Sequence, residues 1–195
     1  MLSETEFSDI LQMKTSIINI IGGPGAGKTL WSAILFSQLK LKERLAEYVN
    51  EYAKKLVWLK DFETLNNQHL VSIKQMRLLK AMDGKVQFVV TDACLLHGVY
   101  YNKFNPDNVS NVEKTEKLIL DWFNLFNNIN IFLVRGSHQY EQAGRYQSET
   151  EAREIDAHME DILIQNQVKY MRFNPDSQTI DDLLKYVFSF ETVEN

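Results

Sequence analysis

Cysteine, proline and long apolar runs are scarce in this sequence of 195 residues. A single cysteine, Cys94, excludes an internal disulfide and any zinc site built from several cysteines. There are three prolines and no stretch rich in Pro, Gly and Ser, which predicts one continuous domain over residues 1–195. The composition is 45% hydrophobic and 24% charged, which excludes a disordered or fibrous protein.

No apolar run approaches the roughly 18 residues that a membrane-spanning helix needs. The first six residues, MLSETE, are acidic, unlike a secretory signal or a transit peptide. We therefore expect a cytoplasmic protein with no membrane partner, located in the host cytoplasm if a phage encodes it. The sequence leaves the oligomeric state open.

The net charge of −5 is unevenly spread. Residues 54–85 carry seven basic and three acidic side chains, whereas residues 149–195 carry four basic and eleven acidic ones. Such asymmetry can mark a face that meets an anionic partner. Solvated helix surfaces are the more common cause, so the pattern leaves both interpretations open.

Strands and helices are expected to alternate along the chain. Short apolar runs predict strands at residues 16–21, 46–49, 86–90, 130–134 and 168–173. Periodic apolar residues and two capping boxes, which begin at Ser110 and Ser148, predict helices at residues 27–44, 62–82, 110–126, 148–163 and 180–187. This order predicts an α/β fold in three layers, with a five-stranded parallel sheet and helices on both faces.

Residues 22–29 match the phosphate-loop pattern G-x-x-x-x-G-K-[ST] at every fixed position. The pattern follows an expected strand and opens an expected helix, which predicts a P-loop NTPase. Glycines let backbone N–H groups curl around phosphates, and the helix N-terminus adds partial positive charge. Lys28 is expected to reach the β- and γ-phosphates of ATP, and the Thr29 hydroxyl to bind Mg²⁺. The expected ATP-binding residues are Gly22, Gly23, Pro24, Gly25, Ala26, Gly27, Lys28 and Thr29.

Asp92 ends the expected strand beside the phosphate-loop strand, where its carboxylate would face the ligand crevice and hold Mg²⁺. A capping or surface aspartate is the alternative. A GTPase would carry a glycine three residues after Asp92, but Leu95 stands there. An ATPase motor usually carries a glutamate next to the aspartate, but this chain has Ala93. A small kinase fits best.

A kinase also needs a lid that excludes water and a base that accepts the acceptor's proton. The polar segment at about residues 135–148 is the expected lid, and its Arg135 and Arg145 are expected to contact the transferred phosphoryl group. Two solvated loop arginines are the alternative. Glu51 follows the expected strand 46–49 and is the candidate base, unless it only stabilises a helix N-terminus.

For several other side chains the sequence gives less specific predictions. Tyr100 and Tyr101 could stack on a base or a sugar, and Trp58 is expected in the core. We expect Cys94 to be a small packing residue, because no histidine-based constellation adjoins it.

With these residues in view, the chain resembles the thymidylate-kinase-like and nicotinamide-riboside-kinase-like P-loop kinases, and above all the small kinase-like P-loop proteins of bacteriophages. The resemblance implies a central phosphate-loop strand with the strand of Asp92 beside it, and Mg²⁺-ATP as the phosphoryl donor. The phage group includes proteins similar to 5-hydroxymethyluracil DNA kinases. The resembling segments are residues 20–30, 50–58, 90–92, 126–130, 144–147 and 151–156.

The expected function is therefore an Mg²⁺-ATP-dependent kinase acting on a hydroxyl of a nucleoside, a nucleotide or a modified base. Its leading specific acceptor is 5-hydroxymethyluracil in phage DNA. The alternatives are a small-molecule nucleotide or nicotinamide riboside kinase, and a regulatory nucleotide-binding ATPase without kinase activity.

Overall fold

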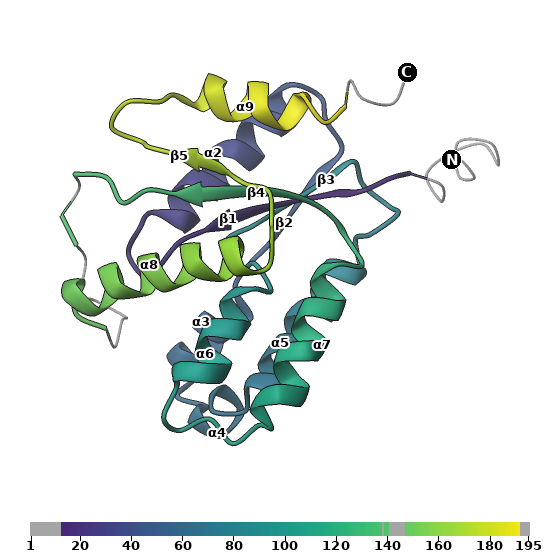
Figure 1. Cartoon of the computed structure of the whole chain (residues 1–195). Coiled ribbons are helices and arrows are strands. Elements are labelled where there is room, and N and C mark those ends of the chain that lie inside the picture. Colours follow the sequence, from purple (N-terminus) through teal and green to yellow (C-terminus); the bar gives the residue numbers. More distant parts are fainter. Residues whose placement is uncertain (1–12, 138, 141–146, 192–195) are drawn as a thin grey trace.

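The computed structural model describes residues 13–137, 139–140 and 147–191. Its centre is a five-stranded parallel sheet in the order β2-β3-β1-β4-β5, as expected (Figure 1). The strands are β1 (Ser16–Ile21), β2 (Ala46–Val49), β3 (Phe88–Thr91), β4 (Asn127–Leu133) and β5 (Met171–Phe173). The phosphate-loop strand β1 is central and the strand before Asp92 is its neighbour, which confirms the expected fold class.

Helices cover both faces of the sheet because the strands are apolar on both sides. Ile18 and Ile20 of β1 pack in one core with α2 (Lys28–Leu41) and α9 (Ile180–Phe188). Ile17 and Ile21 point the other way, into a core with α5 (Gln68–Lys80), α6 (His97–Phe104), α7 (Val112–Phe123) and α8 (Glu149–Gln165). Within the described ranges no helix is long and apolar enough to cross a membrane.

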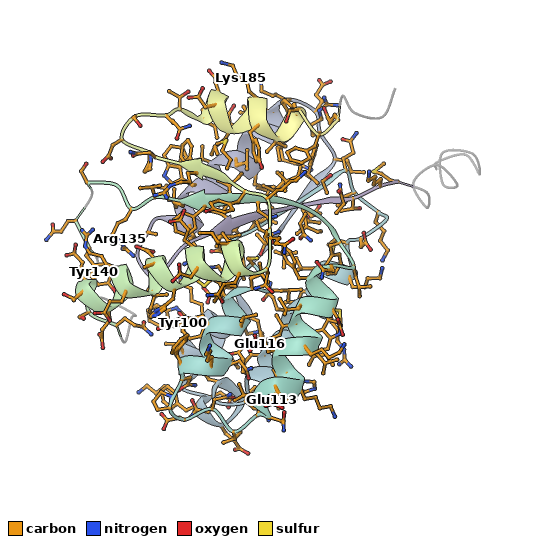
Figure 2. All side chains as sticks on the ribbon, viewed as in Figure 1. Tyr100, Glu113, Glu116, Arg135, Tyr140 and Lys185 are labelled. Atoms are coloured by element: carbon orange, nitrogen blue, oxygen red, sulfur yellow. The ribbon has the colours of Figure 1, made fainter. Side chains whose placement is uncertain are left out.

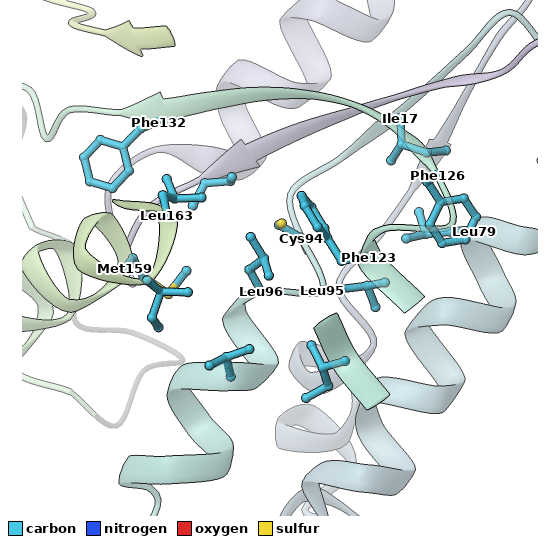
Figure 3. Close-up of a cluster of buried hydrophobic side chains, with 14 of the residues drawn as sticks. Ile17, Leu79, Cys94, Leu95, Leu96, Phe123, Phe126, Phe132, Met159 and Leu163 are labelled. Atoms are coloured by element: carbon cyan, nitrogen blue, oxygen red, sulfur yellow. The ribbon is translucent and has the colours of Figure 1, made fainter. Parts of the chain in front are cut away.

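The second core surrounds Cys94, whose side chain is 2% exposed (Figure 3). It packs with Leu96, Phe123 and Met159, so residues from α7 and α8 meet beneath the sheet. Burial raises the pKa of the Cys94 thiol to about 12, which disfavours the nucleophilic thiolate. Cys94 is a packing residue here.

A lobe of helices extends from the face of the sheet that α8 also covers (Figure 1). It contains α3 (Tyr52–Leu59) and α4 (Phe62–Leu65) as well as α5, α6 and α7. The prediction of a single helix at residues 62–82 is wrong, because the helix is interrupted between α4 and α5. The Asn67 side chain caps α5 by accepting a hydrogen bond from Leu70 N at 3.2 Å, so the second helix starts there.

The capping box expected at Ser110 is also wrong. Asn111 is the N-cap of α7, and its side chain accepts a hydrogen bond from Lys114 N at 2.9 Å. The Ser110 hydroxyl instead bonds to the side-chain oxygens of Asn102 and Asn108, at 2.9 and 2.8 Å. The second expected capping box, of Ser148 with Glu151, is confirmed at the start of α8.

The strand β4 begins three residues earlier than expected, at Asn127. Asparagines explain the difference, because the buried Asn19 amide donates to the side-chain oxygens of the half-buried Asn128 and the buried Asn130, at 2.9 and 3.0 Å. These bonds keep polar side chains inside the sheet, where the apolar pattern gives no sign of a strand. The strand β5 is shorter than expected, since Val168 N bonds to Leu163 O and ends α8.

Candidate active site

The phosphate loop joins β1 to α2 at the carboxyl edge of the sheet. Gly27 precedes α2 with a φ of 97°, and no side chain caps the helix. The first turn of α2 contains no acidic residue. The N–H groups and the positive end of this helix are therefore suited to an anionic ligand.

Lys28 lies over its own loop, where its Nζ donates a 2.9 Å hydrogen bond to Gly23 O. Burial lowers the pKa of Lys28, and the carboxylates of Glu51, Asp92 and Asp156 oppose that shift. Three acidic residues from separate parts of the chain thus surround the one cation of the loop.

Thr29 and Asp92 meet directly, as the sequence predicts for a shared site. The Thr29 hydroxyl donates a 2.6 Å hydrogen bond to Asp92 Oδ2. Asp92 is 3% exposed, and its Oδ1 has no hydrogen-bond partner among the described residues. A buried carboxylate oxygen with nothing bonded to it is costly unless it has a ligand.

The surroundings of Asp92 fit a hydrated cation. The hydroxyls of Ser32 and Tyr48 are also buried, and neither makes a hydrogen bond of good geometry within the described part of the chain. Burial raises the pKa of Tyr48, and the charge of Asp92 and a weak hydrogen bond to its carboxylate raise it further, so the two side chains are close. Mg²⁺ favours oxygen ligands, takes one or two carboxylates and keeps several waters. Residues 13–137, 139–140 and 147–191 contain no cluster of three or more His, Cys, Asp and Glu side chains that could hold a metal ion.

Asp156 connects the phosphate loop to α8 and to Arg135. Its Oδ1 accepts a 2.6 Å hydrogen bond from Gly23 N, and its Oδ2 pairs with Arg135 Nε at 2.8 Å. Only glycine fits at position 23, because a Cβ there would lie 2.6 Å from both Ala152 O and Asp156 Oδ1. The loop is therefore held by contacts that lie outside the motif.

Arg135 lies beneath this loop. Its side chain is 6% exposed, and its Nη2 donates a 2.9 Å hydrogen bond to Pro24 O. The alternative of a solvated loop arginine is therefore wrong for Arg135. Its Nη1 is buried without a hydrogen-bond partner among the described residues, 3.4 Å from where a Cβ on Gly25 would be. Arg135 supports the loop, and its contact with a phosphoryl group remains a prediction.

Tyr140 lies next to Gly25 of the phosphate loop and beside Arg135, near the start of α8 (Figure 2). The centre of its ring lies 5.8 Å from the Arg135 guanidinium carbon. Gly25 has a φ of 72°, and a Cβ there would lie 2.5 Å from the Tyr140 ring. Arg145 and the middle of the expected lid, residues 138 and 141–146, lie outside the described residues, so the lid stays a prediction.

Glu51 stands at the same edge of the sheet as Asp92, because Val49 at the end of β2 pairs with Thr91 at the end of β3. It occupies the N-cap position of α3 but makes no capping hydrogen bond, so its carboxylate is available for another role. Burial raises the pKa of Glu51, Asp92 adds to the shift, and Lys28 opposes it. A raised pKa suits a carboxylate that accepts a proton near neutral pH.

His97, at the start of α6, is a site residue that the sequence analysis missed. Its Nε2 lies 3.1 Å from Gly22 O. Burial and the charge of Lys28 lower the pKa of His97 to about 3, so its ring is neutral at pH 7. The only signal for it was its place five residues after Asp92, at the start of a helix that was not expected.

These groups border a cavity of about 1240 Å³ between the phosphate loop and the helical lobe. Trp58 lines it and is 68% exposed, so the expectation of a core position is wrong. Gln75 anchors α3 to the wall, because its Oε1 accepts a 3.0 Å hydrogen bond from Tyr52 N. Other lining residues from the lobe include Lys54, Phe62, Gln68, Ser72, Tyr100, Tyr101 and Phe104.

A family model described as an AAA domain matches residues 17–179, which include the phosphate loop, Glu51, Asp92 and Asp156. The chain belongs to the AAA domain family. The phosphate loop and the family together imply that this AAA domain binds a nucleotide. Comparison with curated protein sequences finds no match.

Several solved structures share the fold of this AAA domain. YorR from Bacillus subtilis, solved with phosphorylated GDP, is 15% identical over 91% of this chain and 96% of that chain, with a TM-score of 0.56. Deoxyadenosine kinase from M. mycoides, with dCMP and dCDP, is 18% identical over 90% and 98%, with a TM-score of 0.54. Thymidylate kinase from Ehrlichia chaffeensis is 14% identical over 92% and 100%, with a TM-score of 0.56. At these identities the likeness establishes the fold.

Proposed function

We propose that this AAA domain is an Mg²⁺-ATP-dependent kinase that phosphorylates a hydroxyl of a nucleoside, a nucleotide or a modified base. The observation that carries the proposal is the position of Glu51, a half-buried carboxylate with a raised pKa that lines the same cavity as Lys28. The cavity, at about 1240 Å³, exceeds the roughly 300–1,000 Å³ typical of a single small-ligand site. It has room for a donor and an acceptor together.

In the proposed reaction the acceptor hydroxyl oxygen attacks the γ-phosphorus of ATP. The bond from that phosphorus to the β,γ-bridging oxygen breaks, and ADP leaves. The hydroxyl proton passes to the Glu51 carboxylate. Lys28 and the N–H groups of the loop offset the negative charge of the phosphates, so that catalysis comes mainly from positioning and electrostatics.

The fit of the site to magnesium rests on Thr29 and Asp92. The Thr29 hydroxyl and the buried Asp92 oxygens would hold the ion, which would neutralise charge on the phosphate oxygens. Asp156 and Arg135 then fix the loop, and with it the phosphates, relative to these two residues.

The folds of a deoxyadenosine kinase and a thymidylate kinase support the proposal, since one enzyme is named for a nucleoside and the other for a nucleotide. The competing function is a regulatory ATPase without an acceptor. Transfer of ³²P from [γ-³²P]ATP to nucleosides, nucleotides and hydroxymethylated DNA distinguishes the two. A kinase gives a labelled acceptor, and its Glu51→Gln variant loses this label. If phosphate is released at the same rate whether or not an acceptor is present, and this holds for every acceptor, the result would favour the ATPase.

The specific acceptor 5-hydroxymethyluracil in DNA receives little support from the cavity. Of the seven basic residues in 54–85, only Lys54 lines it. A DNA acceptor predicts that transfer falls steeply between about 50 and 200 mM salt, because counterions compete for the phosphate backbone. A small acceptor, including nicotinamide riboside, predicts a shallow dependence.

A further inference from the structure

The charged side chains around the cavity are mostly negative. Apart from Lys28 of the phosphate loop, the described charged residues that line it are Glu51, Lys54, Asp107, Glu151 and Glu154. One cation therefore faces four carboxylates. Lys54 lies one turn after Glu51 and already stabilises its charged form, since it opposes the rise in the pKa of Glu51. Among the described lining residues, no cation beyond Lys28 and Lys54 is left for a phosphate of the acceptor.

The carboxylates gather around two tyrosine rings of α6. Burial raises the pKa of Tyr100, and the charges of Glu154 and Glu151 raise it further, which places both carboxylates near this ring. Burial and then the charge of Glu51 raise the pKa of Tyr101. The rings of Tyr100 and Tyr101 meet edge to face, with centroids 5.2 Å apart, and both line the cavity.

The same walls are rich in aromatic surface. Trp58 and Phe104 line the cavity with 68% and 45% of their surface exposed. Exposed rings of this size in a cavity favour a planar ligand that stacks on them. Aromatic faces stack on neutral or cationic rings, and nearby carboxylates attract cations and repel phosphate groups.

We propose that the acceptor is a nucleoside-class compound without phosphate, carrying a neutral or positively charged ring, and that the acidic walls discriminate against nucleoside monophosphates and DNA. This inference rests on the kinase function proposed above. The carboxylates of Glu151 and Glu154 would act as specificity determinants by repelling an acceptor phosphate, while Tyr100 and Tyr101 offer their rings to the base.

The test compares each of several nucleosides with its own 5′-monophosphate, using the full chain and [γ-³²P]ATP at low ionic strength. We expect kcat/KM to be at least 10-fold higher for the best nucleoside than for its monophosphate. In the Glu151→Gln/Glu154→Gln double variant, the ratio of monophosphate to nucleoside kcat/KM should rise several-fold. The rise should shrink at high salt, because both carboxylates are exposed and screened. Glutamine at position 151 can keep the capping box of α8.

Glu113→Gln is the matched control, since Glu113 is exposed on α7 and does not line the cavity (Figure 2). Its ratio should equal that of the wild type. Monophosphates or DNA used as well as nucleosides would overturn the inference and leave the kinase standing. An unchanged ratio in the double variant would also overturn it. Absence of label on every acceptor would defeat the kinase proposal itself.

Discussion

The Asp156 carboxylate accepts a 2.6 Å hydrogen bond from the backbone N–H of Gly23, a residue 133 positions away in the chain. The same carboxylate pairs with Arg135, whose guanidinium holds the Pro24 carbonyl. The shape of the phosphate loop thus depends on α8 and on the segment after β4. This arrangement makes Asp156 a positioning residue for the site.

Asp156→Asn should destabilise the fold and weaken ATP binding together. Asparagine can still accept from Gly23, but it leaves the cation of Arg135 buried and unpaired. Breaking a buried pair in this way costs about 3 kcal/mol. Urea unfolding and ATP titration measure the two effects. Asp121→Asn removes a surface pair with Lys117, and should cost less than about 1 kcal/mol. Equal losses in the two variants would contradict the role of Asp156.

Lys28→Ala should abolish phosphoryl transfer and weaken ATP binding while the protein stays folded, because Lys28 is the cation of the phosphate loop. Transfer assays and circular dichroism provide the two readouts. Lys42→Ala, an exposed position beyond the end of α2, is the control and should behave as the wild type. Normal turnover in the Lys28 variant would rule out the phosphate-loop assignment.

Asp92→Asn should raise the Mg²⁺ concentration at half-maximal activity by about 10-fold or more, because one ligand charge is lost. A magnesium titration at saturating ATP measures the change. Asp161→Asn, at an exposed position on α8, should leave the midpoint in place. If both variants titrate like the wild type, Asp92 has a structural role only.

Glu51→Gln should lower kcat by roughly 10²-fold or more, as expected for the loss of a general base. In the wild type, kcat/KM should fall as the pH drops through a pKa above the ordinary glutamate value, because burial and Asp92 raise it. The protonated form of Glu51 cannot accept the hydroxyl proton. The variant should lack this acidic limb. A limb that persists unchanged in Glu51→Gln would assign the titration to another group.

His97 makes stability depend on pH. Its pKa is about 3 in the folded protein and about 6.5 in an unfolded chain, so the unfolded state binds more protons between these values. The free energy of unfolding should therefore fall as the pH drops from 6.5 towards 3. His97→Gln should show a shallower fall in urea unfolding at pH 7.5, 6 and 5. An equal fall in the variant and the wild type would assign the pH dependence to other groups.

The short helices α3 and α6 show where sequence patterns fail to predict secondary structure. The eight-residue helices α3 and α6 were not expected, because helices of this length gain little stability from their own sequence. Contacts from other segments stabilise them, such as the bond from Tyr52 N to Gln75 on α5. Trp58 was placed in the core because it is large and apolar, but α3 turns it toward the cavity.

The sequence by itself determined the sheet, the phosphate loop and the approach of Asp92 to Thr29. Buried parallel strands need continuous apolar runs, and the loop motif occupies one contiguous segment, so both are visible locally. Only the tertiary structure decided that Asp156 accepts a hydrogen bond from Gly23, that Arg135 donates one to Pro24 and that His97 contacts Gly22. These partners are 75 or more residues apart along the chain, and their contacts follow from how α6, α8 and the segment after β4 pack on the sheet.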